Sequence, residues 1–172
     1  MRAGIFYAAA IAGALLATPA LAQDMTVTLA DPAWDGKTIP ASQVCGRFGG
    51  KGAVSPKMLA SNVADGVVAI EIWFSDDNNE RMNWGGHGKV KYLVPAGSRT
   101  LELKSFPAES DNLPEGVVSV RDHKGSQWSG TNGAYLPPCS GGRGHVYSAY
   151  ILARDADGDR VGPRTNIKFG KF

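Results

Sequence analysis

Three histidines are the side chains of this sequence best suited to acid–base or anion-binding chemistry. His87 and His145 each directly follow a glycine, and they open the strand-like segments "HGKVKYLV" and "HVYSAYILARD". An imidazole at a strand end can donate a hydrogen bond to an anion, and its charge switches near neutral pH. His87 and His145 could therefore meet at one rim of the fold, but spacing alone favours the alternative, that each is an exposed residue at a strand end. His123 stands in a polar turn, and we expect it to be solvated.

A carboxylate that could orient these imidazoles occurs where the most apolar segment of the chain ends. Residues 67–74 ("VVAIEIWF") predict a central strand that is buried on both faces. The acidic run "SDDNNE" follows at residues 75–80, and Asp76 is its carboxylate nearest the strand. Asp76 is therefore well placed to line a cleft, although the acidic run alone favours the alternative, a hairpin loop of no binding role.

Metal binding and covalent catalysis are not indicated by the motifs. The segment "DADGD" at residues 155–159 has alternating carboxylates, but a calcium loop needs glycine and glutamate where Arg160 and Ile167 stand. A tight Asp-Gly turn between two strands is the better interpretation. The sequence contains no G-x-S-x-G, H-E-x-x-H or P-loop pattern. We expect a protein without metal or cofactor that is not an enzyme, and a hydrolase whose catalytic groups meet only in the fold is the less favoured alternative.

The N-terminus has the pattern of a secretory signal. A basic start, Met1-Arg2, precedes an apolar run that ends in Ala20-Leu21-Ala22, a signal-peptidase site. We expect cleavage of residues 1–22, which leaves one domain, residues 23–172, in the periplasm or outside the cell. A membrane anchor is the alternative. No second apolar stretch is long enough to span a bilayer.

Cysteine content and charge limit the partners further. Cys45 and Cys139 are the only cysteines, and in an exported protein such a pair predicts a disulfide, with free thiols as the alternative. The 18 basic residues nearly balance 16 acidic ones and form no basic block, so we expect no nucleic-acid partner.

Short alternating segments separated by glycine and proline predict an all-β domain with little helix. Besides residues 67–74, the expected strands are residues 25–29, 89–94, 100–106, 117–122, 145–155 and 165–172. The best candidate helix is residues 55–66, with Pro56 in its first turn and Gly66 as its stop. A β-sandwich or β-barrel accounts for this pattern.

Several motifs follow one another between residues 33 and 155. They are "WDGKTIPASQVC" (34–45), "SP" (55–56), the apolar strand with its acidic loop, the Trp-Gly-Gly-His segment (84–87), "LPEG" (113–116), "YLPPC" (135–139) and "GHVY" (144–147). This order resembles the phosphatidylethanolamine-binding protein family, also called Raf kinase inhibitor-like, and in particular a divergent member of its bacterial branch. The divergence includes Val146, which stands where that branch has an arginine.

The resemblance implies a sandwich of two antiparallel sheets with Greek-key connections and a rim pocket for phosphate-like or other anionic head groups. By matched position, the implied ligand-binding residues are Asp76, His87, Tyr135, His145 and Tyr147, with Trp84 as the aromatic residue before the histidine. Cys45 and Cys139 match cysteine positions of the bacterial branch. The expected function is an exported, non-catalytic binding protein for a small anionic ligand. The alternative is an interaction or inhibitor module that docks on another protein of the cell envelope.

Overall fold

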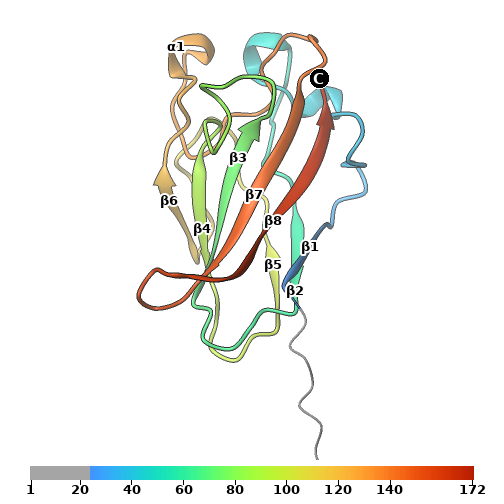
Figure 1. The fold of residues 1–172 in the computed structure, drawn as a ribbon. Coiled ribbons are helices and arrows are strands. Elements are labelled where there is room, and N and C mark those ends of the chain that lie inside the picture. The colour runs from blue at the N-terminus through green and yellow to red at the C-terminus, as the bar shows by residue number, and fades with distance from the viewer. Residues whose placement is uncertain (1–23) are drawn as a thin grey trace, which may run out of the picture.

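Two antiparallel sheets form the protein, and the computed structural model describes residues 24–172 (Figure 1). The predicted signal peptide, residues 1–22, lies outside the described residues. The smaller sheet has the order β1-β2-β5, with β1 Thr26–Leu29, β2 Met58–Ser61 and β5 Thr100–Leu103. The larger has the order β6-β4-β3-β7-β8, with β3 Ala69–Asp76, β4 Lys89–Leu93, β6 Val117–Arg121, β7 Val146–Arg154 and β8 Arg160–Lys171. The all-β sandwich predicted from the sequence is confirmed.

One apolar core fills the space between the sheets. Alternate residues of β3 point into it, and the ring of Phe74 lies at its centre. That ring contacts the rings of Phe106, Tyr135 and Phe169 at centroid distances of 6.4, 4.5 and 6.1 Å. Aromatic pairs of this kind add about 0.5–1.5 kcal/mol each beyond their buried area. The core therefore holds β3, and the site residue at its end, in a fixed position.

The outer face of β3 is less buried than the sequence predicted. Trp73 and Glu71 are only half-buried there, because within residues 24–172 no second layer covers this side of the larger sheet. The Lys89 ammonium lies 3.3 Å from the Trp73 ring centroid, and Arg154 Nε donates to Glu71 at 2.8 Å. Long basic side chains thus shield the apolar surface that a covering layer would otherwise bury.

The candidate helix at residues 55–66 is wrong. Part of it forms β2, which pairs with β1 on one side and β5 on the other. Met58 and Ala60 alternate into the core, and this pairing outweighs the weak helix propensity of the segment. The helices of the described chain are short: α1 Ser126–Ser129 and the 3₁₀ turns Ala41–Gln43 and Gly46–Phe48. Within residues 24–172, none could cross a membrane.

The predicted Asp-Gly turn is confirmed between β7 and β8. Asp155 Oδ1 accepts the backbone N–H groups of Asp157 and Asp159, at 3.1 and 2.8 Å. Gly158 carries the positive φ of 85° that such a turn needs. These bonds set the long hairpin that places Phe172 at the same end of the sandwich as the start of β7 (Figure 1).

The predicted disulfide is also present at this end. Cys45 and Cys139 are joined with an S–S distance of 2.03 Å across a sequence separation of 94 residues. Cys45 is buried beside Met82 and Leu136. The bridge ties the Gly46–Phe48 turn to the loop that precedes β7. Two segments far apart in the chain thus become neighbouring walls.

Candidate functional site

A pocket of about 380 Å³ opens at this end of the sandwich. Its walls come from the Gly46–Phe48 turn, the loop between β3 and β4, helix α1 and the loop before β7. The lining residues are Arg47, Phe48, Asp76, Asn79, Met82, His87, Trp128, Leu136, Cys139, Ser140, Arg143 and His145. Three of the residues predicted from the sequence, Asp76, His87 and His145, therefore share one cavity.

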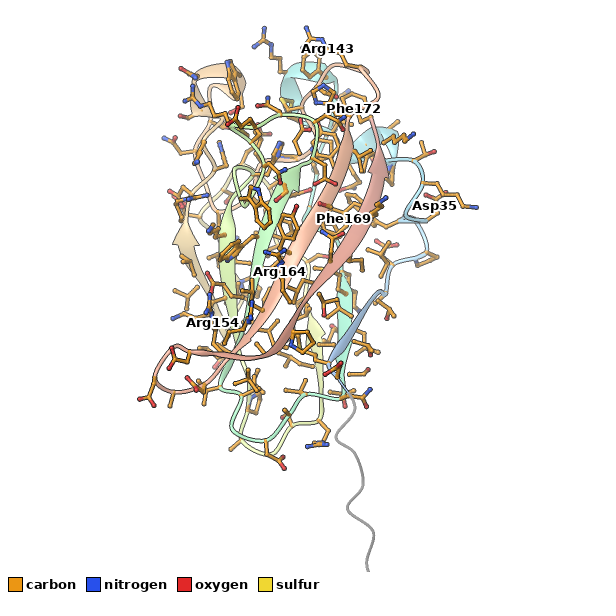
Figure 2. All side chains as sticks on the ribbon, viewed as in Figure 1. Asp35, Arg143, Arg154, Arg164, Phe169 and Phe172 are labelled. Atoms are coloured by element: carbon orange, nitrogen blue, oxygen red, sulfur yellow. A yellow bond between two sulfur atoms is a disulfide. The ribbon has the colours of Figure 1, made fainter. Side chains whose placement is uncertain are left out.

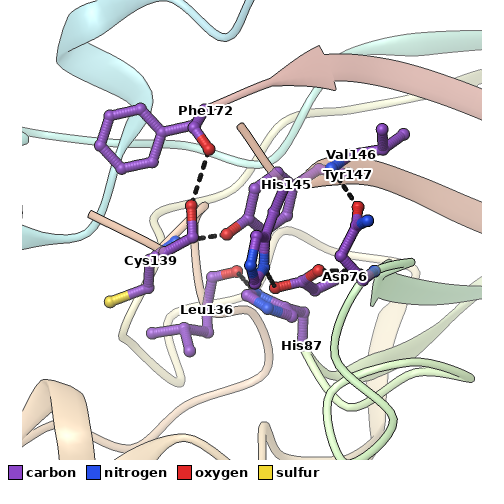
Figure 3. A network of polar contacts seen from close by, with 10 residues as sticks. Asp76, His87, Leu136, Cys139, His145, Val146, Tyr147 and Phe172 are labelled. Atoms are coloured by element: carbon purple, nitrogen blue, oxygen red, sulfur yellow. Dashed lines mark hydrogen bonds and ion pairs between the residues drawn. The ribbon is translucent and has the colours of Figure 1, made fainter. Parts of the chain in front are cut away.

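Asp76 and His145 form a hydrogen-bonded pair in the pocket wall (Figure 3). Asp76 is the last residue of β3 and pairs in register with Tyr147 of β7, which brings His145 beside it. His145 Nδ1 lies 2.7 Å from Asp76 Oδ2, and Asp76 Oδ1 accepts the Asn78 N–H at 2.9 Å. The carboxylate is only 3 % exposed. It fixes the imidazole so that Nε2 is the ring nitrogen left for a ligand.

His87 is buried and neutral. Its Nδ1 donates to the Leu136 carbonyl at 2.8 Å, and its side chain is 3 % exposed. Burial, which disfavours the charged imidazole, lowers the pKa of His87 to about 4. Since Nδ1 carries the hydrogen, Nε2 holds a lone pair at neutral pH. His87 can thus accept a hydrogen bond from a ligand, whereas the sequence analysis expected it to donate one.

A close backbone approach positions His87. The next residue, Gly88, has a φ of 113°, and a Cβ at this position would meet the Ala134 carbonyl oxygen at 2.0 Å. Only glycine allows this approach, which lets the His87 carbonyl accept the Leu136 N–H at 2.9 Å. His87 and Leu136 are therefore joined by two hydrogen bonds, one between their backbones and one from the imidazole to the Leu136 carbonyl.

The two predicted tyrosines stand behind the pocket instead of lining it. The Tyr147 hydroxyl accepts the Cys139 N–H at 3.1 Å, and its ring packs edge-on against His87 at 5.3 Å. Burial raises the pKa of Tyr147 to about 12, and it also raises the pKa of Tyr135. Tyr135 belongs to the core beside Phe74. Both tyrosines support the wall, and neither is among the residues that face the cavity.

Trp84 is not brought to the pocket. It lies on the outer face of the larger sheet, 46 % exposed, where its ring stacks on Tyr150 at a centroid distance of 4.2 Å. The Arg164 guanidinium lies 4.6 Å from the Trp84 ring centroid. The backbone at Trp84 is left-handed, with a φ of 52°. The aromatic residues that do face the cavity are Trp128 and Phe48.

Two arginines of the pocket were missed by the sequence analysis. Arg47 lies on the Gly46–Phe48 turn, where its Nη1 donates to the Trp128 carbonyl at 3.0 Å, and Arg143 lies on the loop before β7. Both side chains are exposed, and Figure 2 shows Arg143 at the end of the sandwich. Each follows one of the two cysteines within four residues. The sequence did contain a signal for both arginines. Each lies close to one of the two cysteines that were predicted to form a disulfide.

His123 is buried, contrary to the prediction that it is solvated. It is 5 % exposed, and its Nδ1 accepts the Gly125 N–H at 3.3 Å. Burial lowers its pKa. It lies outside the pocket lining, on the loop between β6 and α1. Nowhere in residues 24–172 do three or more His, Cys, Asp or Glu side chains gather as a metal site would require.

The burial of His87 predicts a loss of stability in acid. His87 takes up its proton near pH 4 in the folded protein but near pH 6.5 when unfolded. Between these values the unfolded chain binds more protons, so the free energy of unfolding falls as the pH is lowered through this window. The free energy of unfolding should fall less in His87→Asn than in the wild-type protein between pH 7 and pH 4.5, by about 2 kcal/mol, because asparagine does not titrate. Urea unfolding at both pH values measures this difference, and equal losses in the two proteins would contradict it.

Comparison with known proteins identifies the fold. No family model matches the sequence, and no curated protein matches it significantly. The crystal structure of Escherichia coli YbcL, described as a new member of the mammalian PEBP family, is similar with a TM-score of 0.57. The alignment has 17 % sequence identity and covers 87 % of this chain and 98 % of the YbcL chain. This likeness and the two-sheet architecture show that the chain has the fold of the phosphatidylethanolamine-binding protein (PEBP) family.

Proposed function

We propose that this protein is a non-catalytic binding protein whose pocket takes a small anionic ligand, such as phosphate or a phosphorylated head group. The observation that carries the proposal is the convergence of Arg47 and Arg143 on the cavity that also contains the Asp76–His145 pair. A guanidinium group can bind a phosphate or carboxylate through two parallel hydrogen bonds.

The charges of the lining residues support an anionic ligand. Arg47 and Arg143 are positive, and Asp76 is the one acidic residue among the described residues that line the pocket. Asp76 is already paired with His145 and lies in the wall, while both arginines are exposed. An incoming anion would therefore meet the arginines first.

The aromatic residues at the pocket favour a ligand with an apolar part. Phe48 and Trp128 line the cavity and are 42 % and 38 % exposed. Their rings offer apolar surface beside the two cationic groups. A phosphate ester with an apolar substituent, including a lipid head group, would use both kinds of surface.

The polar groups of the pocket support binding over catalysis. Ser140, which among residues 24–172 is the one pocket-lining residue with a hydroxyl, donates it to the Phe172 carbonyl at 2.7 Å. His87, with its pKa near 4, is a weak general base at neutral pH. We therefore propose that the ligand is held and released unchanged.

We also propose that the protein is exported. Residues 1–22 have the sequence of a cleavable signal, and the disulfide between the only two cysteines is typical of the periplasm or the extracellular space. Export would place the pocket where phospholipid head groups and soluble phosphate esters are both present.

Calorimetric titration of the purified protein with inorganic phosphate at pH 7 and fixed ionic strength tests the proposal. We expect one saturable site per chain, with affinity that falls as salt is added, because part of the attraction is between exposed charges. Glucose serves as an uncharged control. The absence of any saturable heat at millimolar phosphate would overturn the proposed function.

A further inference from the structure

We propose that the pocket selects an anion that carries its own hydrogen-bond donor: hydrogen phosphate or a singly protonated phosphate monoester, in preference to sulfate or a fully deprotonated phosphate ester. The inference rests on the proposed function, because it names which anions that same site accepts. It follows from the kind of groups that meet the ligand at the wall of the pocket.

The first such group is the imidazole of His87. The Leu136 carbonyl can only accept a hydrogen bond, so Nδ1 of His87 must be the protonated nitrogen. Nε2 therefore offers a lone pair at neutral pH. Within residues 24–172, no hydrogen bond reaches this nitrogen, and it is not among the fully enclosed side-chain atoms without a partner. It is therefore available to a donor on the ligand, in a residue that lines the pocket.

The second group is the Asp76 carboxylate. One oxygen accepts from His145 and the other from the Asn78 N–H, which leaves further lone pairs on both oxygens. This carboxylate is an acceptor with a negative charge in a nearly buried position. A tetrahedral anion bound by Arg47 and Arg143 would bring oxygen atoms toward it.

These two acceptors have opposite effects on protonated and unprotonated anions. An oxygen that carries hydrogen donates to Nε2 of His87 or to Asp76 and satisfies it. An oxygen without hydrogen leaves both acceptors unpaired and places like charges close together, which is costly in a buried site. Sulfate has the size and shape of phosphate but carries no proton at neutral pH. The pocket should therefore bind hydrogen phosphate more tightly than sulfate.

A panel of three anions tests the inference on the wild-type protein by calorimetry: inorganic phosphate, sulfate and methyl phosphate. At pH 7 we expect phosphate to bind at least about tenfold more tightly than sulfate, which corresponds to one charged hydrogen bond. Sulfate that binds as tightly as phosphate would overturn the inference and leave the proposed function standing. Failure of all three to bind would overturn both.

The pH dependence provides a second readout. A phosphate monoester loses its last proton near pH 6, whereas inorganic phosphate keeps at least one proton well above pH 7. From pH 6.5 to 8.5, we expect the affinity for methyl phosphate to fall relative to that for phosphate by up to about tenfold per pH unit. The groups that act on His87 are Asp76, His123 and His145 through their charges and Tyr147 through its ring. These groups are the same for both ligands, so their effect on His87 cancels in the ratio of the two affinities, and a constant ratio would contradict the proposal.

Two variants test which of the two acceptors makes the pocket prefer phosphate to sulfate. His87→Asn keeps an N–H group that can reach the Leu136 carbonyl but removes the Nε2 acceptor, and Asp76→Asn removes the charge and adds a donor. Because a singly protonated anion donates to one of the two acceptors, we expect the variant that removes this acceptor to shift the phosphate-to-sulfate affinity ratio toward sulfate by about tenfold and the other variant to shift it less. Asp77→Asn is the matched control, since Asp77 is an adjacent carboxylate that accepts from Ser148 and does not line the pocket. An equal ratio in all four proteins would show that neither acceptor selects the ligand.

Discussion

Replacement of both cysteines by alanine is expected to lower the free energy of unfolding by about 4–5 kcal/mol. The bridge from Cys45 to Cys139 closes a loop across 94 residues, and a crosslink of that span removes much of the entropy of the unfolded chain. The midpoint and slope of urea unfolding measure the change. For a protein of this size, such a loss is a large part of the total stability.

Reduction of the wild-type protein separates the crosslink from the packing of its atoms. Cys45 is buried beside Met82 and Leu136, so alanine also leaves a small cavity there. Wild-type protein treated with dithiothreitol should lose most of the same stability, while the alanine variant should not respond to it. If reduction changes the free energy of unfolding by less than about 1 kcal/mol, the disulfide is not the main constraint on this end of the fold.

Removal of both pocket arginines should abolish most of the anion binding. Each charge-assisted hydrogen bond contributes about 1.5–3 kcal/mol, so Arg47→Ala combined with Arg143→Ala should weaken phosphate binding at least about a hundredfold. Each single variant should lose about tenfold. Lysine at the same positions keeps the charge but not the paired N–H groups, and should fall between wild type and alanine.

Arg164→Ala is the matched control for the arginine variants. Arg164 lies over Trp84 and Tyr150 on the outer face of the larger sheet, away from the end that holds Arg143 (Figure 2). The Arg164→Ala substitution removes the same charge from the protein without changing the pocket lining. An equal loss of phosphate affinity in Arg164→Ala and in the pocket variants would mean that only net charge, and not the pocket, attracts the anion.

The strands could be predicted because their signal is local. Alternation of apolar and polar residues defined β4, β5 and β7 to within a few residues, since one face of each strand packs on the core. Strand β2 was missed because its short sequence contains helix-forming residues. It becomes a strand through pairing with β1 and β5, partners that lie far from it in the chain.

The site was predictable only in part for a related reason. Asp76 and His145 are 69 residues apart, and the pairing of β3 with β7 joins them. Motif order, read against a known family, indicated that pair. It did not indicate which aromatic residue faces the cavity, because Trp84 stacks on Tyr150 of β7, a tertiary contact that the local motif does not encode. Arg47 and Arg143 lie on loops that are far apart in the chain and are joined by the disulfide.

A crystal structure of the protein grown with saturating inorganic phosphate tests the central claim most directly. We predict one phosphate within hydrogen-bond distance of the guanidinium group of Arg47 or Arg143, in the cavity lined by Asp76 and His145. A second basic hollow, lined by Lys37, Lys168 and Lys171, lies elsewhere on the surface. Phosphate bound only at those lysines, with none in the cavity, would contradict the claim.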